Sequence, residues 1–315
     1  DELTELNKSK IKDDYDIILS QLPQLQPIVA KKHFHETGTQ RIFQRFCLVL
    51  TNIKKAVEEI VRLDISPASA GAFIFLCKTK EDTQKDFENK LKELSQLKFP
   101  KPVIIGTSKN FSEFFNYALE IAALKRVKST VDAIEGDAIA KKELNGRLTA
   151  YQNLLFNSLY LNFENADWTF NKDKVKENNL SSIASIISNE VFKLTPIIHN
   201  ELVVRDRLSS MSMSGASNLL TRVFNNSHLK NLGMEGNPSE FGIYLSLIKA
   251  NNLHIKKGDE FIISIENTNN KSIKIIYDEF LKLIKASKEA VNVSDIYAHF
   301  VKQPYGIKIG LLPIL

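Results

Sequence analysis

The chain has 315 residues, of which 43% are apolar and 25% charged, an ordinary composition for a globular protein. At roughly 100–200 residues per domain, this length predicts two or three domains whose cores need no disulfides. Cys47 and Cys77 each lie within an apolar stretch, so we expect buried, reduced thiols and a cytoplasmic location. No apolar run reaches the ~18 residues of a membrane span, and the polar residues 1–12 do not form a secretory signal.

Both ends of the chain look cut. The first residue is Asp1 rather than Met, and the last six residues, 310–315, are apolar with no polar tail. We therefore expect a piece of a longer polypeptide.

The net charge of +5 is spread thinly along the chain. Residues 1–124 carry 18 basic and 17 acidic side chains, residues 125–180 carry 9 and 8, and residues 181–315 carry 15 and 12. No segment is the dense basic stripe that is typical of nucleic-acid-binding proteins. The charge balance therefore permits a contact with DNA without arguing for one.

Residues 1–63 are expected to be mainly helical, because apolar residues from Leu22 to Val29 recur at helical spacing. The segment 33–41 predicts a turn between apolar runs, in which Gly38 takes the left-handed conformation. Residues 41–50 fit either a strand or a helix.

The stretch 70–124 predicts a parallel β-α-β unit with a right-handed crossover. Apolar runs at 72–77 and 102–105 have the length of buried strands, the second closed by Gly106, and apolar residues at helical spacing follow each run. The expected helix starts are the capping pairs Thr79 with Asp82 and Asn110 with Glu113.

Residues 125–165 predict a long helical hairpin, with near-heptad apolar spacing and a corner at Gly136 and Asp137. The polar segment 162–179 that follows is interpreted as a domain boundary. Trp168 lies inside that segment, and we interpret it as an anchor of a contact between domains.

Residues 180–315 predict several short helices, a strand and turns, an order compatible with a winged-helix-like unit. Asn237 and Pro238 are typical of a helix start, and Ser294 is a candidate helix cap. The expected helices are 183–192, 202–224, 237–251, 276–286 and 296–301, with a strand at 261–265 and a turn at 304–306.

The predicted fold is therefore α+β and mostly helical. It comprises a small α/β unit with N-terminal helices (1–124), a helical hairpin with a linker (125–178) and a mostly helical, winged-helix-like domain (179–315).

No complete catalytic, cofactor or metal motif is present in the sequence. Residues 106–109 follow a strand and read Gly-Thr-Ser-Lys, but lack the first glycine and the spacing of a phosphate-binding loop, so an ordinary loop is favoured over an anion site. His33, His35 and Glu36 would share a metal ion only on a strand, and a solvated or turn-capping role is favoured.

The remaining polar clusters are interpreted mainly as structural. The serines of 209–217 lack the spacing of a nucleophile motif, and Glu88 with Lys90 has a nuclease-like spacing but lies in a predicted helix. Glu201 and Arg205 would form an (i, i+4) pair in a helix. We favour a surface ion pair there, with a buried network or interface clasp as the alternative.

Four segments in this order resemble the region downstream of the nucleotide-binding core in very large bacterial phage-defence ATPases, of which the BREX-type phage-resistance ATPases are the most similar group. The resemblance covers about residues 30–315. The segments are ETGTQR at 36–41 with Phe43, AKKELNGRL at 140–148, TPIIHNEL at 195–202 with Arg205 and 208–210, and PYGIKIG at 304–310.

The resemblance implies a P-loop ATPase module elsewhere in the parent protein, and partners among other defence proteins and DNA. This chain lacks the Walker motif, so the resemblance transfers neither ATPase activity nor any catalytic residue, cofactor or metal ligand.

We therefore expect a non-catalytic part of a phage-defence ATPase that positions the parent on DNA or on a partner protein. The alternatives are a protein-interaction scaffold that binds no nucleic acid, in which the hairpin at 125–165 docks a partner helix, and a degenerate nucleotide-binding module using 106–109. The candidate DNA-contacting residues are Lys249, Lys256, Lys257, Lys271 and Lys274.

Overall fold

The computed structural model describes residues 2–63, 68–108, 112–130, 137–287 and 290–315. Helices account for 53% of the chain and accompany a mixed sheet, which confirms the predicted α+β, mostly helical class. The chain forms two compact units: unit 1 comprises residues 1–28 and 42–183, and unit 2 comprises residues 29–41 and 184–315. Among the described residues, no helix is both long and apolar enough to cross a bilayer.

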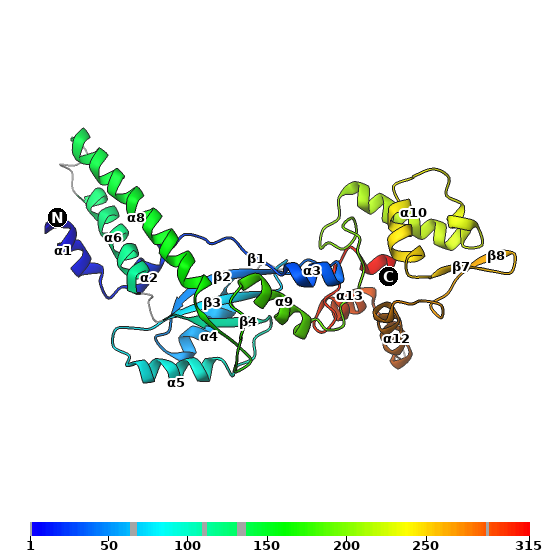
Figure 1. The fold of residues 1–315 in the computed structure, drawn as a ribbon, viewed down its shortest axis with the longest axis horizontal. Helices are drawn as coiled ribbons and strands as arrows, with labels where there is room; N and C mark the ends of the chain where they lie inside the picture. The colour runs from blue at the N-terminus through cyan, green and yellow to red at the C-terminus, as the bar shows by residue number, and fades with distance from the viewer. Residues whose placement is uncertain (1, 64–67, 109–111, 131–136, 288–289) are drawn as a thin grey trace. The chain divides into compact units, whose positions relative to one another are not determined.

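A six-stranded sheet organises unit 1 in the described part of the chain, with its strands side by side in chain order (Figure 1). The first three long strands, β2, β3 and β4, are parallel, while β4–β5 and β5–β6 are antiparallel. The predicted parallel β-α-β unit is thereby confirmed. The strands are β1 (Ile28–Val29), β2 (Ile42–Val49), β3 (Gly71–Cys77), β4 (Val103–Thr107), β5 (Asp167–Phe170) and β6 (Asp173–Lys174).

Helices α4 (Ile53–Arg62) and α5 (Gln84–Leu94) cover one face of this sheet. The core between them contains Ile74 of β3, which is fully buried. Helix α5 begins after Thr83, whose hydroxyl accepts from the backbone N–H of Asp86 in a capping box. The predicted start at Thr79 was wrong, because Thr79 only accepts a turn hydrogen bond from the backbone of Asp82.

The opposite face of the sheet packs against α6 (Ser112–Thr130) and α8 (Ala138–Glu164). Phe75 of β3 contacts Phe114 of α6 and Phe163 of α8, with ring centroids 5.9 and 5.5 Å apart. The two helices pack along each other as a hairpin, and α1 (Glu2–Ile11) packs on α6, beside the short helix α2 (Tyr15–Leu19). Unit 1 therefore has helices on both faces of its sheet.

The hairpin begins earlier in the sequence than predicted, at the start of α6 instead of residue 125. Asp137, one of the two predicted corner residues, caps α8 by accepting from the backbone N–H groups of Ile139 and Ala140. Gly136, the other corner residue, and Asn110, the predicted cap of α6, lie outside the described residues.

Trp168 is a core residue of unit 1 and not the predicted anchor between domains. Its side chain is 1% exposed, and its ring centroid lies 5.0 Å from that of Phe73 and 5.7 Å from that of Phe163. It belongs to β5, so the polar segment 162–179, which was interpreted as a boundary, contributes strands to the sheet.

Two local predictions near the N-terminus need correction. The segment predicted as a turn forms helix α3 (Lys31–Thr37), although Gly38 ends it in the left-handed conformation as expected, with φ of 76°. Residues 22–27, expected to be helical, form no helix and lead into β1, while the ambiguous run 41–50 contains strand β2.

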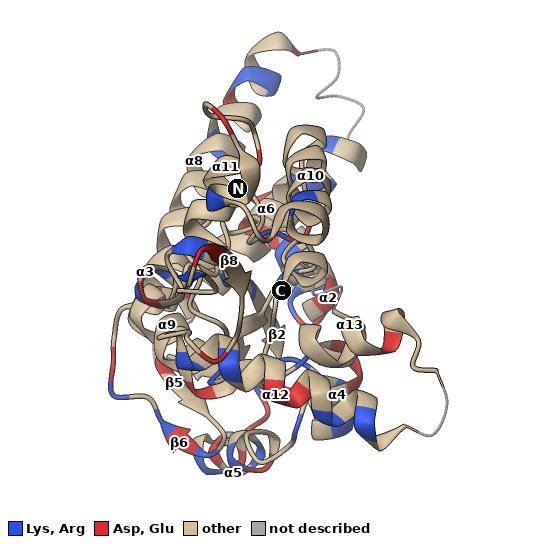
Figure 2. Ribbon diagram, turned by 90° about the vertical axis from the view of Figure 1, so that its right-hand side faces the viewer, with Lys and Arg blue, Asp and Glu red and all other residues tan. Residues whose placement is uncertain are grey.

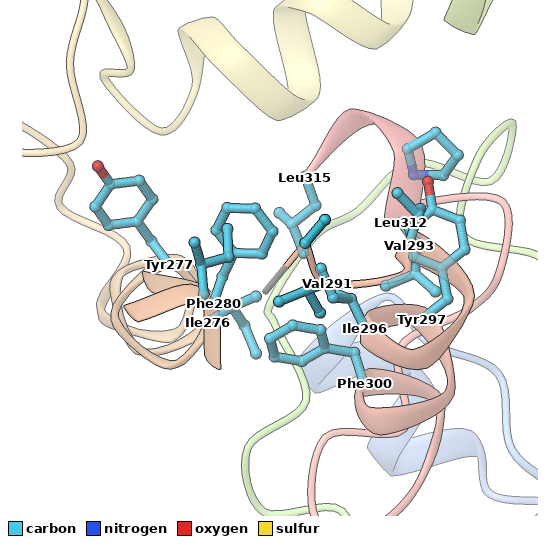
Figure 3. Close-up of a pocket in the computed structure, with 13 residues that line it drawn as sticks. Ile276, Tyr277, Phe280, Val291, Val293, Ile296, Tyr297, Phe300, Leu312 and Leu315 are labelled. Atoms are coloured by element: carbon cyan, nitrogen blue, oxygen red, sulfur yellow. The ribbon is translucent and has the colours of Figure 1, made fainter. Parts of the chain in front are cut away.

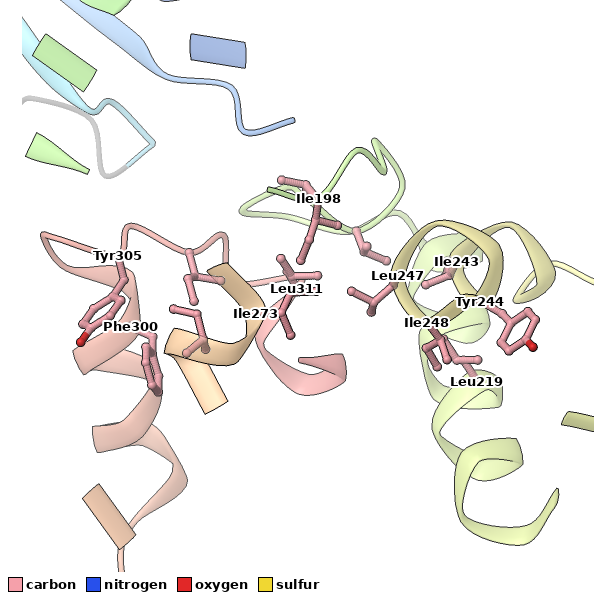
Figure 4. Close-up of a cluster of buried hydrophobic side chains, with 14 of the residues drawn as sticks. Ile198, Leu219, Ile243, Tyr244, Leu247, Ile248, Ile273, Phe300, Tyr305 and Leu311 are labelled. Atoms are coloured by element: carbon pink, nitrogen blue, oxygen red, sulfur yellow. The ribbon is translucent and has the colours of Figure 1, made fainter. Parts of the chain in front are cut away.

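Unit 2 is a bundle of short helices with a β-hairpin around one apolar core. Figure 4 shows Ile198, Leu247, Ile273 and Leu311 converging in that core from separate segments. Its elements, counting α9, which begins in unit 1, are α3 (Lys31–Thr37), α9 (Leu180–Val191), α10 (Ser210–Asn226), the 3-10 turn η1 (Lys230–Gly233), α11 (Phe241–Ile243), the π-helix η2 (Tyr244–Lys249), β7 (His254–Lys257), β8 (Glu260–Ile263), α12 (Lys271–Ala286), α13 (Val293–Val301) and η3 (Leu312–Ile314).

Several boundaries in unit 2 differ from the prediction. Residues 201–207 form turns and bends, so α10 starts only after its cap, Ser209. The helix expected at Asn237 begins at Phe241, and α13 is capped by Asn292 rather than by Ser294. The expected strand near 261 exists as β8, but its partner β7 was not predicted.

Candidate nucleic-acid interface

The scaffold of the candidate interface is the succession α10, α11 with η2, and the hairpin β7–β8. A helix, a second helical stretch and a β-hairpin follow one another here, and α10 packs on α11 while β7 packs on η2. The hairpin turns at Gly258, whose φ of 67° is the left-handed value that tight hairpin loops require at one position. The sheet has two strands.

An ion pair fixes α10 against the start of α11. Arg222 Nε donates to Glu240 Oε1 at 2.8 Å, and the Ser239 hydroxyl donates to Oε2 at 3.2 Å. Glu240 is 3% exposed, and this burial acts to raise its pKa. The hydrogen bonds from Arg222, from its own backbone and from Ser239 outweigh burial, so the pKa of Glu240 is lowered. The ionised carboxylate of Glu240 therefore stabilises the contact between α10 and the start of α11.

A buried histidine joins the hairpin to both helices. His254 Nε2 lies 2.9 Å from the carbonyl of Ser227, which can only accept, so Nε2 carries the proton. In the neutral ring Nδ1 then accepts from the Tyr244 hydroxyl at 2.9 Å. Phe261 of β8 packs 5.2 Å from the histidine ring. This arrangement holds β7 against η2 and the end of α10.

The five predicted lysines lie on three elements of unit 2, and all are exposed. Lys249 ends η2, Lys256 and Lys257 lie on β7, and Lys271 and Lys274 lie in the first turn of α12. None of the five forms an ion pair with another described residue. Their charges are therefore available to an outside anion.

A pair of asparagines connects two of these elements. Asn270, the cap of α12, donates from Nδ2 to Oδ1 of Asn251 at 2.8 Å, and Asn251 lies just after the end of η2. Asn251 in turn donates to the backbone carbonyl of Leu247 in η2 at 2.7 Å. The structure thus ties the segment that carries Lys249 to the segment that carries Lys271.

Acidic residues interrupt this set of lysines. Glu260 lies directly opposite Lys257 in the hairpin, and Asp259 is at its tip. Asp278 follows Lys274 by four residues on α12. The arrangement suits contacts between single lysines and phosphates, and it is not a continuous basic stripe.

Segments from three of the four family-like motifs meet around Arg41, which is 5% exposed. Its Nη2 donates to the Thr195 hydroxyl at 3.0 Å and to the Gly306 carbonyl at 2.6 Å, and the guanidinium lies 4.1 Å from the ring centroid of Phe192. Burial lowers the pKa of Arg41 to about 10, although the negative charge of Asp206 acts to raise it. These motifs therefore build a core contact rather than a catalytic site; the fourth, at 140–148, lies on α8 in unit 1.

The Glu201–Arg205 pair is a surface pair, as favoured from the sequence. The charged atoms are 3.9 Å apart, and both side chains are more than half exposed. The neighbouring Asp206 forms the closer contact, accepting from Lys308 Nζ at 2.5 Å. Burial lowers the pKa of Lys308, while Asp206 acts to raise it.

His33 and His35 do not form a metal site. Both lie on α3, where residues two apart point in different directions, so His33 is buried and His35 exposed. His33 Nδ1 lies 2.5 Å from Asn189 Oδ1, and burial lowers the pKa of His33. Among the described residues no group of three or more potential ligands could hold a metal ion.

Gly106, the glycine of the candidate phosphate-binding loop, is explained by packing. A Cβ on Gly106 would lie 2.3 Å from the ring of Trp168, so the glycine is needed for close packing. Lys109 lies outside the described residues. Lys90, from the nuclease-like pair, is engaged by Asp82 at 2.7 Å, while Glu88 accepts from Gln84 on the same helix.

The serines are structural, and the two cysteines lie close together in the sheet of unit 1. Ser209 accepts from the backbone N–H of Ser212 as the cap of α10, and Ser212 is buried. Cys47 and Cys77 are free thiols on neighbouring strands with their sulfurs 3.5 Å apart. Burial raises the pKa of Cys77, which favours the neutral thiol over the thiolate.

Each unit also contains a cavity. In unit 2, α12, α13 and the last residues enclose about 620 Å³ lined by apolar side chains, with Phe280, Phe300 and Leu315 facing the space (Figure 3). In unit 1, about 420 Å³ lies beside the end of β2 between Asp13, Asp16 and Lys55. The lining of the first cavity is almost entirely apolar, whereas that of the second includes carboxylates and lysines.

Sequence patterns missed the residues that organise the candidate interface. Arg222 with Glu240 and Tyr244 with His254 are separated by 18 and 10 residues, so no local spacing marks them.

Comparisons with protein-family models, with curated proteins and with solved structures found no match for this chain.

Proposed function

We propose that the chain is a non-catalytic positioning module of a large bacterial phage-defence ATPase, and that unit 2 holds the parent protein on DNA. The observation that carries this proposal is the set of five exposed lysines on the hairpin, the end of η2 and the start of α12, none of which forms an ion pair within the described part of the chain. In this proposal the partners are DNA and other defence proteins, and the module works in the bacterial cytoplasm.

The contact is with the phosphate backbone and reads no base sequence. Base edges are read mainly by Arg, Lys, Asn, Gln, Asp and Glu side chains. The helical stretch that precedes the hairpin, α11 with η2, contains one residue of these types, Lys249, at its last position. Lysine contacts to phosphates release counterions, so the affinity falls steeply as the salt concentration rises.

The test is fluorescence-polarisation binding of the whole chain to a mixed-sequence duplex and to single-stranded DNA, at about 50 and 200 mM salt. We expect duplex binding that weakens strongly at the higher salt and is weaker in the variant Lys256→Ala/Lys257→Ala. The matched control is Lys141→Ala/Lys142→Ala, a pair of adjacent exposed lysines on α8 in unit 1. Absence of binding at low salt, or equal losses in both variants, would reject the proposal.

A second candidate function is a protein-interaction scaffold, favoured by apolar side chains on the outside of α8. Leu154 and Leu161, seven residues apart on one side of that helix, are 45% and 57% exposed. An apolar interface there would resist salt, in contrast to DNA binding. Retention of a partner protein at high salt, abolished by Leu161→Glu, would support this function.

A further inference from the structure

Two free thiols lie side by side in the sheet of unit 1, although they are 30 positions apart in the sequence. Cys47 is on β2 and Cys77 on β3, and their sulfur atoms are 3.5 Å apart. In the register of these parallel strands Cys47 lies opposite Phe75, and Cys77 lies two positions further along β3 on the same face. A disulfide bond is about 2.05 Å long, so the sulfurs need to approach each other by only about 1.5 Å.

The two thiols differ in their access to solvent. Cys47 is partly exposed, whereas Cys77 is fully buried. The two strands carry no acidic side chain, and β2 accordingly shows no red in Figure 2, so no carboxylate of these strands opposes a thiolate at Cys47. A dissolved oxidant therefore meets Cys47 first, with a second thiol held beside it. An accessible thiol next to a resolving thiol is the arrangement of redox-sensitive cysteine pairs.

We infer that Cys47 and Cys77 form a reversible oxidation site whose oxidant is a small peroxide. The Cys47 thiolate attacks one oxygen of hydrogen peroxide, so that a sulfur–oxygen bond forms and the oxygen–oxygen bond breaks. The hydroxide that leaves takes up the proton that Cys47 released and becomes water. Cys47 is now a sulfenic acid.

The second thiol completes the reaction. The sulfur of Cys77 attacks the sulfur of Cys47, a disulfide bond forms, and the sulfur–oxygen bond breaks. The departing hydroxyl group leaves as water with the proton of the Cys77 thiol. In total the two thiols lose two electrons, which reduce one peroxide to two water molecules.

The position of the pair allows the bond to close and makes it easy to reduce. Cys77 is the last residue of β3, and its pairing with Val49 ends the ladder between β2 and β3. The end of the strand can therefore shift without opening pairs inside the ladder. Diagonal neighbours are farther apart than directly opposite residues, so the bond strains the backbone. Strained disulfides are the ones that thiol reductants open most readily.

The bond acts on the aromatic contacts of the same face. Phe75, opposite Cys47, lies 5.5 Å from Phe163 between ring centroids, and Phe163 lies 5.7 Å from Trp168. A shift of the end of β3 toward β2 is passed through these rings to the single tryptophan of the chain. Oxidation should therefore change the tryptophan fluorescence of the folded protein.

The test treats the reduced whole chain, freed of reductant, with hydrogen peroxide beside a small reference thiol. Free thiols are counted after denaturation, and peptides are mapped by mass spectrometry without reduction. We expect both thiols to be lost together, in one linked pair of peptides that contains Cys47 and Cys77. The rate should not depend on protein concentration, because the bond lies within one chain. Dithiothreitol should restore both thiols and the original fluorescence.

Two variants separate the roles of the cysteines. Cys77→Ser should accumulate a trappable sulfenic acid at Cys47, because no second thiol resolves it. Cys47→Ser should lose its remaining buried thiol roughly tenfold more slowly than the wild type. Circular dichroism checks that each variant stays folded.

Three results would overturn the site. The first is a wild type that keeps both thiols while the reference thiol is consumed. The second is a peptide map with oxidised Cys47 beside free Cys77, or with the bond between two chains. The third is a Cys47→Ser variant whose thiol reacts as fast as those of the wild type, which would reject Cys47 as the first thiol to be oxidised.

Discussion

Gly106 illustrates how a single missing side chain shapes unit 1. In the sequence it belongs to a group of residues weighed as an anion-binding loop. In the structure its backbone lies directly against the ring of Trp168, where a Cβ would approach Cε3 to 2.3 Å. The tryptophan is held from its other sides by Phe73 and Phe163. The glycine therefore serves packing, and any side chain there displaces the largest residue of the core.

Gly106→Ala should destabilise unit 1 by about 1–3 kcal/mol, because the added methyl group overpacks a closed core. Urea unfolding followed by tryptophan fluorescence measures the change. The matched control is Gly146→Ala on helix α8, where a Cβ meets nothing within 4 Å. That substitution should stabilise by up to about 1 kcal/mol through helix propensity. Equal effects of the two substitutions would contradict the packing role of Gly106.

Glu240 makes the stability of unit 2 depend on pH. Its folded-state pKa is lowered, because the hydrogen bonds to the carboxylate outweigh its burial. A carboxylate with a lowered folded pKa contributes stability above its unfolded pKa of about 4.3 and loses that contribution as the pH falls through the folded value. The urea midpoint should therefore drop between pH 6 and pH 3 by more in the wild type than in Glu240→Gln. Identical pH profiles of the wild type and Glu240→Gln would contradict this role of the carboxylate.

At the scale of elements, the hydrophobic pattern predicted those strands that are continuous apolar runs and those helices whose apolar residues follow a strong period. Strands β3 and β4 were predicted because both are apolar at nearly every position, and α12 because its apolar residues follow a helical period. Strand β7 was missed because its sequence, HIKK, is mostly polar and forms a strand only by pairing with β8. Helix α3 was missed because two histidines and a lysine pair obscure its period.

The candidate lysines could be selected from the sequence, but their supporting contacts could not. Single basic residues can be located without a structure, whereas the hydrogen bond between His254 and Ser227 joins residues 27 positions apart. The same holds for Arg41, whose acceptor Gly306 lies 265 residues away. Such long-range polar pairs depend on the tertiary fold, and one sequence contains no periodic signal for them.

The contact around Arg41 should be a main determinant of the stability of unit 2. Arg41→Ala removes the donor to Thr195 and Gly306 and leaves a cavity beside Phe192. We expect a loss of about 2–4 kcal/mol from the two effects together. Arg62→Ala, at an exposed arginine on α4, should change stability by less than about 0.5 kcal/mol. Urea unfolding followed by circular dichroism compares the two, and a loss at Arg41 no larger than at Arg62 would contradict the assignment.

At the scale of the whole molecule, the chain builds two cores from interleaved segments. Unit 2 takes residues 29–41 from between two parts of unit 1, so neither unit is a continuous stretch. Each unit nevertheless has its own apolar cluster, one around β3 and the other around α10, η2 and α12. Trp168, the single tryptophan of the chain, lies in the core of unit 1. Its fluorescence therefore reports on unit 1, while circular dichroism reports on the helices of both.

This placement predicts that damage confined to unit 2 separates the two signals. In Arg41→Ala the loss of helix should begin at a lower urea concentration than the change in tryptophan fluorescence, because the core around Trp168 keeps all of its contacts. In Gly106→Ala the order should reverse, since that substitution overpacks the tryptophan itself. A chain that unfolds as one cooperative body would instead shift both signals together in both variants. The comparison thus measures whether the two compact units are also two units of stability.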